Sequence, residues 1–140
     1  MRQILLFAAL AASLALLSGC ALSKAKADTA EDMPDKAAYH KLSAEEAYEM
    51  MASQEVVVVD VRTREEYDGG HIENAVLVPN ESIGIEMPEA LPDKEATLLI
   101  YCRSGRRSKD AAQKLLALGY QSVYDFGGVI DWPYELVKEG

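Results

Sequence analysis

One stretch of the chain, Cys102-Arg103-Ser104-Gly105-Arg106-Arg107-Ser108, places a single thiol among three guanidinium groups. It follows an apolar, β-rich run at 96–101 and precedes a segment with helical spacing that begins near Ser108. A strand that enters a tight glycine-containing loop and then a helix points backbone N–H groups and the positive end of the helix dipole at one place, which favours an anion there. Nearby arginines and a helix N-terminus also lower the pKa of a cysteine and stabilise its nucleophilic thiolate. The loop therefore predicts a cradle for a reactive Cys102 sulfur.

The elements around this loop alternate between strands and helices. We expect strands at 39–42, 55–61, 75–78, 97–101 and 120–126, and helices at 43–52, 63–68, 108–118 and after Gly128, with a short helix in the loop at 81–94. Capping-box spacing begins the first two helices, at Ser43 and Thr63. Such alternation predicts an α/β fold: one domain with a parallel five-stranded sheet and helices on both faces. Ligands of such sheets lie beyond the carboxyl ends of the strands, where Asp60, Arg62 and Cys102 are expected.

The composition limits the partners of the chain. It has 140 residues, of which 49% are hydrophobic and 26% charged, and a net charge of −9. These values suit one globular domain with short extensions. The negative charge argues against nucleic acid, because binding to a phosphate backbone needs a basic face. The arginines at 103–107 are a local exception, and they predict either a site for a small anion or a solvated charge cluster.

The first residues are typical of an export signal. Met1-Arg2-Gln3 is followed by an apolar run at 4–17 that is shorter than the roughly 20 residues of a membrane-spanning helix. Leu17-Ser18-Gly19-Cys20 resembles a bacterial lipobox, so we expect a lipoprotein signal peptide at 1–19, a lipidated Cys20 with a flexible tether at 20–38, and a domain at 39–140. The resemblance implies an extracytoplasmic protein of the bacterial envelope, anchored to a membrane through Cys20. A plain signal peptide or an uncleaved anchor remains the alternative.

Lipidation of Cys20 would leave Cys102 as the one thiol of the mature chain, without a partner for a disulfide. We expect no metal site, because the two histidines are far apart in the sequence and one thiol is available. An unpaired cysteine in an exported protein favours a functional thiol.

Three motifs together resemble the rhodanese-like domains. They are Asp60-Val61-Arg62-Thr63-Arg64-Glu65-Glu66-Tyr67 with the later Gly70-His71-Ile72 and Ala75, the loop at 102–108, and Phe126-Gly127-Gly128-Val129-Ile130-Asp131-Trp132. They cover about residues 39–137 in the order and spacing of that family.

The resemblance implies a sulfurtransferase without a cofactor. Cys102 would take a sulfane sulfur from a small anionic donor such as thiosulfate, form a persulfide, and pass the sulfur to cyanide, an external thiol or a protein. It also implies a monomer. The resemblance assigns the persulfide cradle and substrate contacts to Arg103, Ser104, Gly105, Arg106 and Arg107, with Arg103 and Arg107 nearest the donor's charge. It implies that Asp60 and Arg62 brace the loop, whereas for Arg62 an ion pair that caps the strand is equally expected, and that His71 makes a structural hydrogen bond.

Two other functions remain open. The first is a membrane-tethered rhodanese-like module that binds a partner or senses oxidants or sulfide without turnover. The second is a cysteine phosphatase or arsenate reductase, which resembles Cys-x5-Arg. Here Arg107 falls one position earlier than that pattern requires and Ser108 occupies the arginine position, so the ring is tighter and better suited to a sulfane sulfur.

Overall fold

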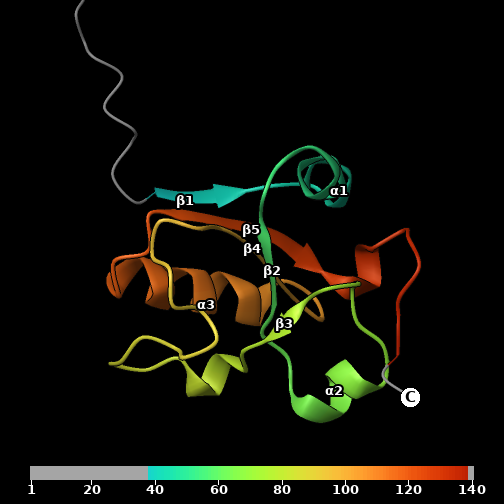
Figure 1. Ribbon diagram of the computed structural model, residues 1–140. Helices are drawn as coiled ribbons and strands as arrows, with labels where there is room; N and C mark the ends of the chain where they lie inside the picture. Colours follow the sequence, from blue (N-terminus) through green and yellow to red (C-terminus); the bar gives the residue numbers. More distant parts are fainter. Residues whose placement is uncertain (1–37, 139–140) are drawn as a thin grey trace, which may run out of the picture. The chain divides into compact units, whose positions relative to one another are not determined.

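The computed structural model describes residues 38–138, which form a parallel five-stranded sheet between helices (Figure 1). The strands are β1 (Ala38–Lys41), β2 (Val57–Asp60), β3 (Val76–Leu77), β4 (Thr97–Cys102) and β5 (Ser122–Gly128), in the order β1-β5-β4-β2-β3. The helices are α1 (Ala44–Ser53), α2 (Arg64–Asp68) and α3 (Arg106–Ala117), with 3₁₀ turns at Asn80–Ser82 and Val129–Asp131. Every pair of neighbouring strands is parallel, which confirms the predicted fold.

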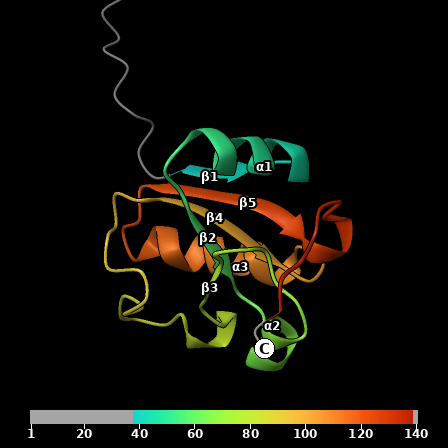
Figure 2. The same cartoon turned by 45° about the vertical axis from the view of Figure 1, so that its right-hand side comes forward.

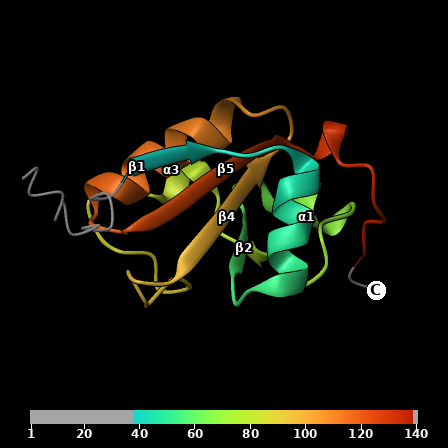
Figure 3. The ribbon, with the colours of Figure 1, turned by 90° about the horizontal axis from the view of Figure 1, so that it is seen from above.

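Both faces of the sheet are covered. On β4, Leu98 and Ile100 pack in a cluster with the buried face of α3, whereas Leu99 and Tyr101 pack in a second cluster with Ala47 of α1. Figure 2 and Figure 3 show α1 and α3 on opposite sides of the sheet. Strand side chains alternate between faces, so two buried faces require an almost continuous apolar run. The need for apolar residues on both faces explains the valines of β2. The strand order places β4 at the centre of the sheet.

The two predicted capping boxes are present. Ser43 N–H donates to the Glu46 carboxylate (2.7 Å), and Glu46 N–H donates to the Ser43 hydroxyl (3.1 Å). Thr63 and Glu66 make the same pair of contacts at 3.1 and 3.2 Å. Each box satisfies N–H groups that the first helical turn leaves unpaired. The second box also holds the Glu66 carboxylate in place at the start of α2.

The C-terminal part differs from the predicted helix. Gly127 and Gly128 extend β5, and the chain then makes only the 3₁₀ turn Val129–Asp131, which ends at Trp132. Pro133 disfavours helical backbone at the residue before it, so the turn stops there. The prediction of a terminal helix containing Trp132 is therefore wrong, although Trp132 does belong to the core.

The predicted signal peptide, Cys20 and the predicted tether up to residue 37 lie outside the described residues. The first element of the described residues is β1, which begins at Ala38, one residue before the strand predicted at 39–42. Within 38–138, no helix has the length and apolar character needed to span a membrane.

Candidate active site

Cys102 is the last residue of β4, and its sulfur lies in the loop that leads to α3. Gly105 N–H donates to Cys102 Sγ at 3.0 Å. Burial is the largest effect on this thiol and opposes ionisation, since Cys102 is only 1% exposed. Hydrogen bonds from the Ser108 hydroxyl and from the N–H groups of Ser108, Gly105 and Ser104 act in the other direction, and the net result is a lowered pKa of Cys102. The geometry therefore favours a thiolate, and it does so mainly through these hydrogen bonds rather than through the arginines that the sequence analysis invoked.

Gly105 is the residue that turns the loop toward the sulfur. Its φ is 98°, a left-handed conformation that favours glycine, and it is the N-cap of α3. In this conformation its N–H faces Cys102 while its carbonyl begins the helix. The helix consequently starts at Arg106, two residues before the predicted start.

Ser108 is a cradle residue that the sequence analysis did not assign. Its Oγ lies 3.6 Å from Cys102 Sγ and donates to the carbonyls of Gly105 (3.1 Å) and Gly127 (3.3 Å). A hydroxyl has one proton and two lone pairs, so it accepts from a protonated thiol and rotates to donate to a thiolate. The resemblance placed the cradle at residues 103–107 and did not include Ser108. The position of Ser108 at the end of the cysteine-arginine motif could have indicated that it contacts Cys102.

Arg107 is paired with a carboxylate on another element. Its guanidinium donates to both oxygens of Glu66 in α2, at 2.7 and 2.8 Å. The arginine hydrogen bonds are the main cause that lowers the pKa of Glu66 to about 2. The pair is partly exposed and fixes the loop to α2. Arg103 and Arg106 are exposed, so they carry the positive charge at the surface of the loop.

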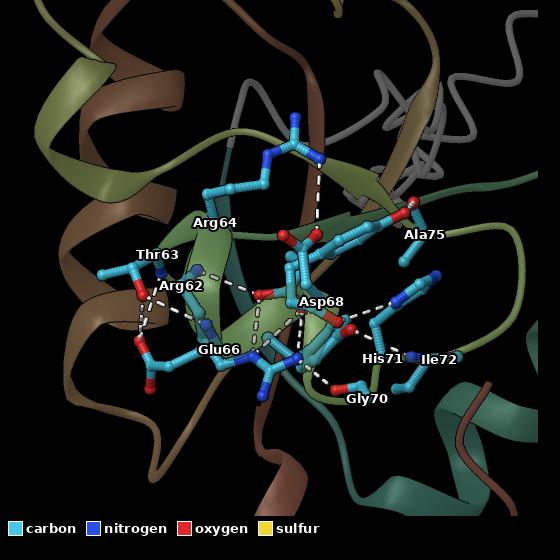
Figure 4. A network of polar contacts seen from close by, with 12 residues as sticks. Arg62, Thr63, Arg64, Glu66, Asp68, Gly70, His71, Ile72 and Ala75 are labelled. Atoms are coloured by element: carbon cyan, nitrogen blue, oxygen red, sulfur yellow. Dashed lines mark hydrogen bonds and ion pairs between the residues drawn. The ribbon is translucent and has the colours of Figure 1, made fainter. Parts of the chain in front are cut away.

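Asp60 and Arg62 form a buried pair that braces the neighbouring turn. Figure 4 shows Arg62 beside Gly70 in this turn. Arg62 donates to both Asp60 oxygens, at 2.6 Å for the shortest contact, and to the Gly70 carbonyl at 2.8 Å. Its guanidinium also lies 5.5 Å from the ring centre of Tyr101, whose hydroxyl accepts from Ile72 N–H. This network ties the end of β2 to the turn after α2 and to the residue before Cys102. It is a supporting role.

His71 has a structural environment. Its Nδ1 lies 2.9 Å from the Tyr67 carbonyl, and its ring stacks on the Tyr67 ring with centroids 3.6 Å apart. Its backbone pairs with Val137 near the end of the described chain. The histidine is 4% exposed and joins the C-terminal segment to the turn after α2.

Two glycines at the end of β5 allow the loop to pack closely on the sheet. A Cβ added to Gly128 would lie 2.6 Å from Ser104 Cα and closer still to the Arg103 carbonyl oxygen. Ile130 N–H donates to that same carbonyl at 3.2 Å. The Gly-Gly motif thus supports the outer side of the cradle.

The other end of the sheet has a different character. A hollow of about 440 Å³ is lined there by residues of β2, β4 and the preceding loop, among them Val57, Leu91 and Leu98. It lies at the amino ends of the strands, away from Cys102. In the part of the chain that the structure describes, no three His, Cys, Asp or Glu side chains gather as metal ligands would.

Known proteins share this fold. The family model of the rhodanese-like domain matches residues 43–133. A tRNA uridine(34) hydroxylase of Yersinia pestis is 32% identical over 106 residues, which are 72% of this chain but only 30% of that protein. A human single-domain sulfurtransferase is 27% identical with a TM-score of 0.59, covering 66% of this chain and 93% of that one. A thiosulfate sulfurtransferase of Pseudomonas aeruginosa is 27% identical with a TM-score of 0.64, covering 73% of this chain and 21% of that one. With the cysteine loop, the Asp60 motif and the Gly-Gly-x-x-x-Trp ending all in place, the chain belongs to the rhodanese-like domain family.

Proposed function

We propose that the protein is a sulfurtransferase that carries sulfur as a persulfide on Cys102. The Cys102 thiolate attacks the sulfane sulfur of a donor such as thiosulfate. A new S–S bond forms, the S–S bond of the donor breaks, and sulfite leaves with the electron pair. An acceptor thiolate or cyanide then attacks the outer sulfur, and Cys102 leaves as the thiolate.

The observation that carries this proposal is the set of donors around one sulfur. Gly105 N–H lies 3.0 Å from Cys102 Sγ, and Ser104 and Ser108 add further hydrogen bonds. Fixed donors of this kind stabilise negative charge without reorganising during the reaction. They suit the resting thiolate and the anionic persulfide equally, so both halves of the cycle use the same cradle.

The charges of the loop favour an anionic donor. Arg103 and Arg106 are exposed at its surface, on a chain whose net charge is −9. Arg107 is held by Glu66 at 2.7 Å, so its role is to position the loop and to offset the local negative charge. We assign the first encounter with the donor to Arg103 and Arg106, and this revises the expected order of the arginines.

The acceptor is a separate molecule in this proposal. Cys102 is the free cysteine of residues 38–138, so this part of the chain offers no second thiol to release the sulfur. We further propose that the lipidated Cys20 holds a monomeric domain at the bacterial envelope. The tRNA hydroxylation in the relatives' name is not part of the proposal, because this chain spans 30% of their length and its acidity disfavours tRNA.

Intact mass measurement tests the transfer directly. A chain without residues 1–20 is incubated with thiosulfate, and Cys102→Ser is the matched control. We expect the wild type alone to gain the mass of one sulfur atom and to lose it again when cyanide or a small thiol is added, with release of sulfite in the first step. A chain that gains no sulfur but hydrolyses a phosphatase substrate would favour the phosphatase alternative. A persulfide that no acceptor removes would favour a sensing module. Metabolic labelling with palmitate, compared with Cys20→Ala, tests the anchor.

A further inference from the structure

Asp125 is a buried carboxylate on β5 with no assigned role. Its side chain is 1% exposed. Oδ2 accepts from the Tyr39 hydroxyl (2.6 Å) and lies 3.3 Å from Lys41 Nζ, both on β1, while Oδ1 accepts from Gly127 N–H (2.9 Å). The carboxylate therefore joins the first strand of the domain to the Gly-Gly segment beside the cradle.

The contact to Gly127 satisfies a backbone group at a β-bulge in β5. Asp125 pairs with Ile100 and Gly127 pairs with Tyr101, so Phe126 is an extra residue in β5 and the ladder shifts at this point. A bulge leaves backbone groups without partners in the ladder. The Asp125 side chain satisfies the Gly127 N–H, and an aspartate can do this two residues along its own chain.

Gly127 in turn contacts two residues of the cradle, Ser108 and Gly105. Its carbonyl accepts from Ser108 Oγ at 3.3 Å, and that hydroxyl lies 3.6 Å from Cys102 Sγ. A Cβ added to Gly105 would lie 3.5 Å from Gly127 Cα, so the two residues are neighbours at van der Waals distance. The position of Gly127 therefore sets the positions of both Ser108 and Gly105.

We propose that Asp125 is a positioning residue for the thiolate cradle, with Tyr39 of β1 holding its carboxylate in the working orientation. Asp125 touches neither the sulfur nor the substrate. It acts through Gly127 on the donors that stabilise the Cys102 anion. The proposal rests on Cys102 being a reactive thiolate, but not on which molecule gives or receives sulfur.

The sign of one measured shift separates positioning from electrostatics. Through space, the negative Asp125 disfavours a thiolate, so loss of the charge would lower the pKa of Cys102. If Asp125 acts by positioning, loss of the oxygen that accepts from Gly127 N–H would loosen Ser108 and raise the pKa of Cys102. Asp125→Asn and Asp125→Leu both remove the charge, but only the asparagine retains an oxygen that can accept from Gly127 N–H.

The experiment measures the rate of alkylation by iodoacetamide against pH for the folded domain. We expect Asp125→Leu to raise the apparent pKa of Cys102, with the rate below that pKa falling about tenfold, the effect of losing one hydrogen bond to a charged group. Asp125→Asn should recover most of that rate. Tyr39→Phe removes the hydroxyl that orients the Asp125 carboxylate but keeps the charge and the Gly127 contact. We therefore expect a folded variant whose alkylation rate falls by only about twofold to threefold, as for one neutral hydrogen bond. Asp110→Asn, in an exposed ion pair on α3, is the matched control.

Three results would overturn the proposal. They are a lowered pKa in both Asp125 variants, equal shifts in Asn and Leu, and an unchanged pKa in Asp125→Leu. If Asp125→Leu does not fold, an unchanged profile in Tyr39→Phe has the same meaning. A wild type with a lowered pKa that accepts no sulfur would refute the proposed transferase and leave this inference standing, whereas sulfur transfer with an unchanged Leu profile would do the opposite.

Discussion

Replacement of Ser108 by alanine tests the cradle most directly, because it removes one donor and leaves the backbone donors in place. Ser108 Oγ lies 3.6 Å from Cys102 Sγ, and the residue is fully buried. Water therefore has no room to replace the hydroxyl without local opening. We expect the pKa of Cys102 to rise toward that of an ordinary thiol.

The size of the effect follows from the geometry. A hydrogen bond to a charged group contributes about 1.5–3 kcal/mol. The contact to sulfur is long, and the hydroxyl is shared with the carbonyls of Gly105 and Gly127, so the lower end applies. About 1.4 kcal/mol corresponds to one pKa unit, and the rate of alkylation below the pKa should fall about tenfold.

The assay is the pH profile of iodoacetamide alkylation, followed by persulfide formation with thiosulfate at a fixed pH. Ser53→Ala is the control, since that exposed hydroxyl only donates to the Glu49 carbonyl on α1. Ser108→Ala should recover normal alkylation at high pH, where the thiol is ionised in both proteins. A pKa that stays the same or falls would refute the account of the cradle, because burial alone would then set the ionisation of Cys102.

Three other regions give further predictions. Arg107→Gln leaves the Glu66 carboxylate unpaired beside the loop. It should lower kcat/KM for thiosulfate about fivefold, equivalent to about 1 kcal/mol for a partly exposed pair. The double variant with Glu66→Gln should recover part of the lost kcat/KM. The pKa of Glu66 is about 2 in the folded protein, below its ordinary 4.5. Its contribution to stability is therefore complete above about pH 4.5 and is lost as the pH falls toward 2. Urea unfolding should show that the free energy of unfolding falls less steeply with acid in Glu66→Gln than in the wild type. Asp60→Asn leaves a buried guanidinium without its counter-charge, and thermal and urea unfolding should show a loss of about 3–5 kcal/mol. Gly128→Ala forces the active-site loop, 2.6 Å from the added Cβ, to move, and should cost about 1–3 kcal/mol while slowing alkylation of Cys102; an unchanged rate would mean that the loop does not depend on this contact.

Local signals in the sequence predicted most of what positions the site. The valines of β2 and the capping boxes at Ser43 and Thr63 act within a few residues, and the structure has each in its expected place. Gly105 lies in the predicted turn, although the helix after it begins two residues earlier than predicted. The carboxyl ends of β2 and β4 do meet, because strands of one parallel sheet share their direction. These features depend on periodicity and turn chemistry, which a single chain displays.

The missed contacts depend on residues far apart in the chain. Arg107 meets Glu66 only because α2 packs beside the loop, and no local pattern encodes that pairing. The sequence analysis assigned no role to Asp125, because its contacts depend on the bulge in β5 and on the neighbouring β1. Tertiary contacts of this kind lie outside what periodicity can report.

The near-complete enclosure of Cys102, at 1% exposure, has a consequence for which molecules can exchange with it. A molecule that reacts with the unmodified thiol must reach a residue that is almost fully covered. In the proposed cycle, the persulfide would add a second sulfur about 2 Å from Cys102 Sγ, the length of an S–S bond. An acceptor in that cycle would attack the outer sulfur and would not need to contact Cys102 Sγ itself.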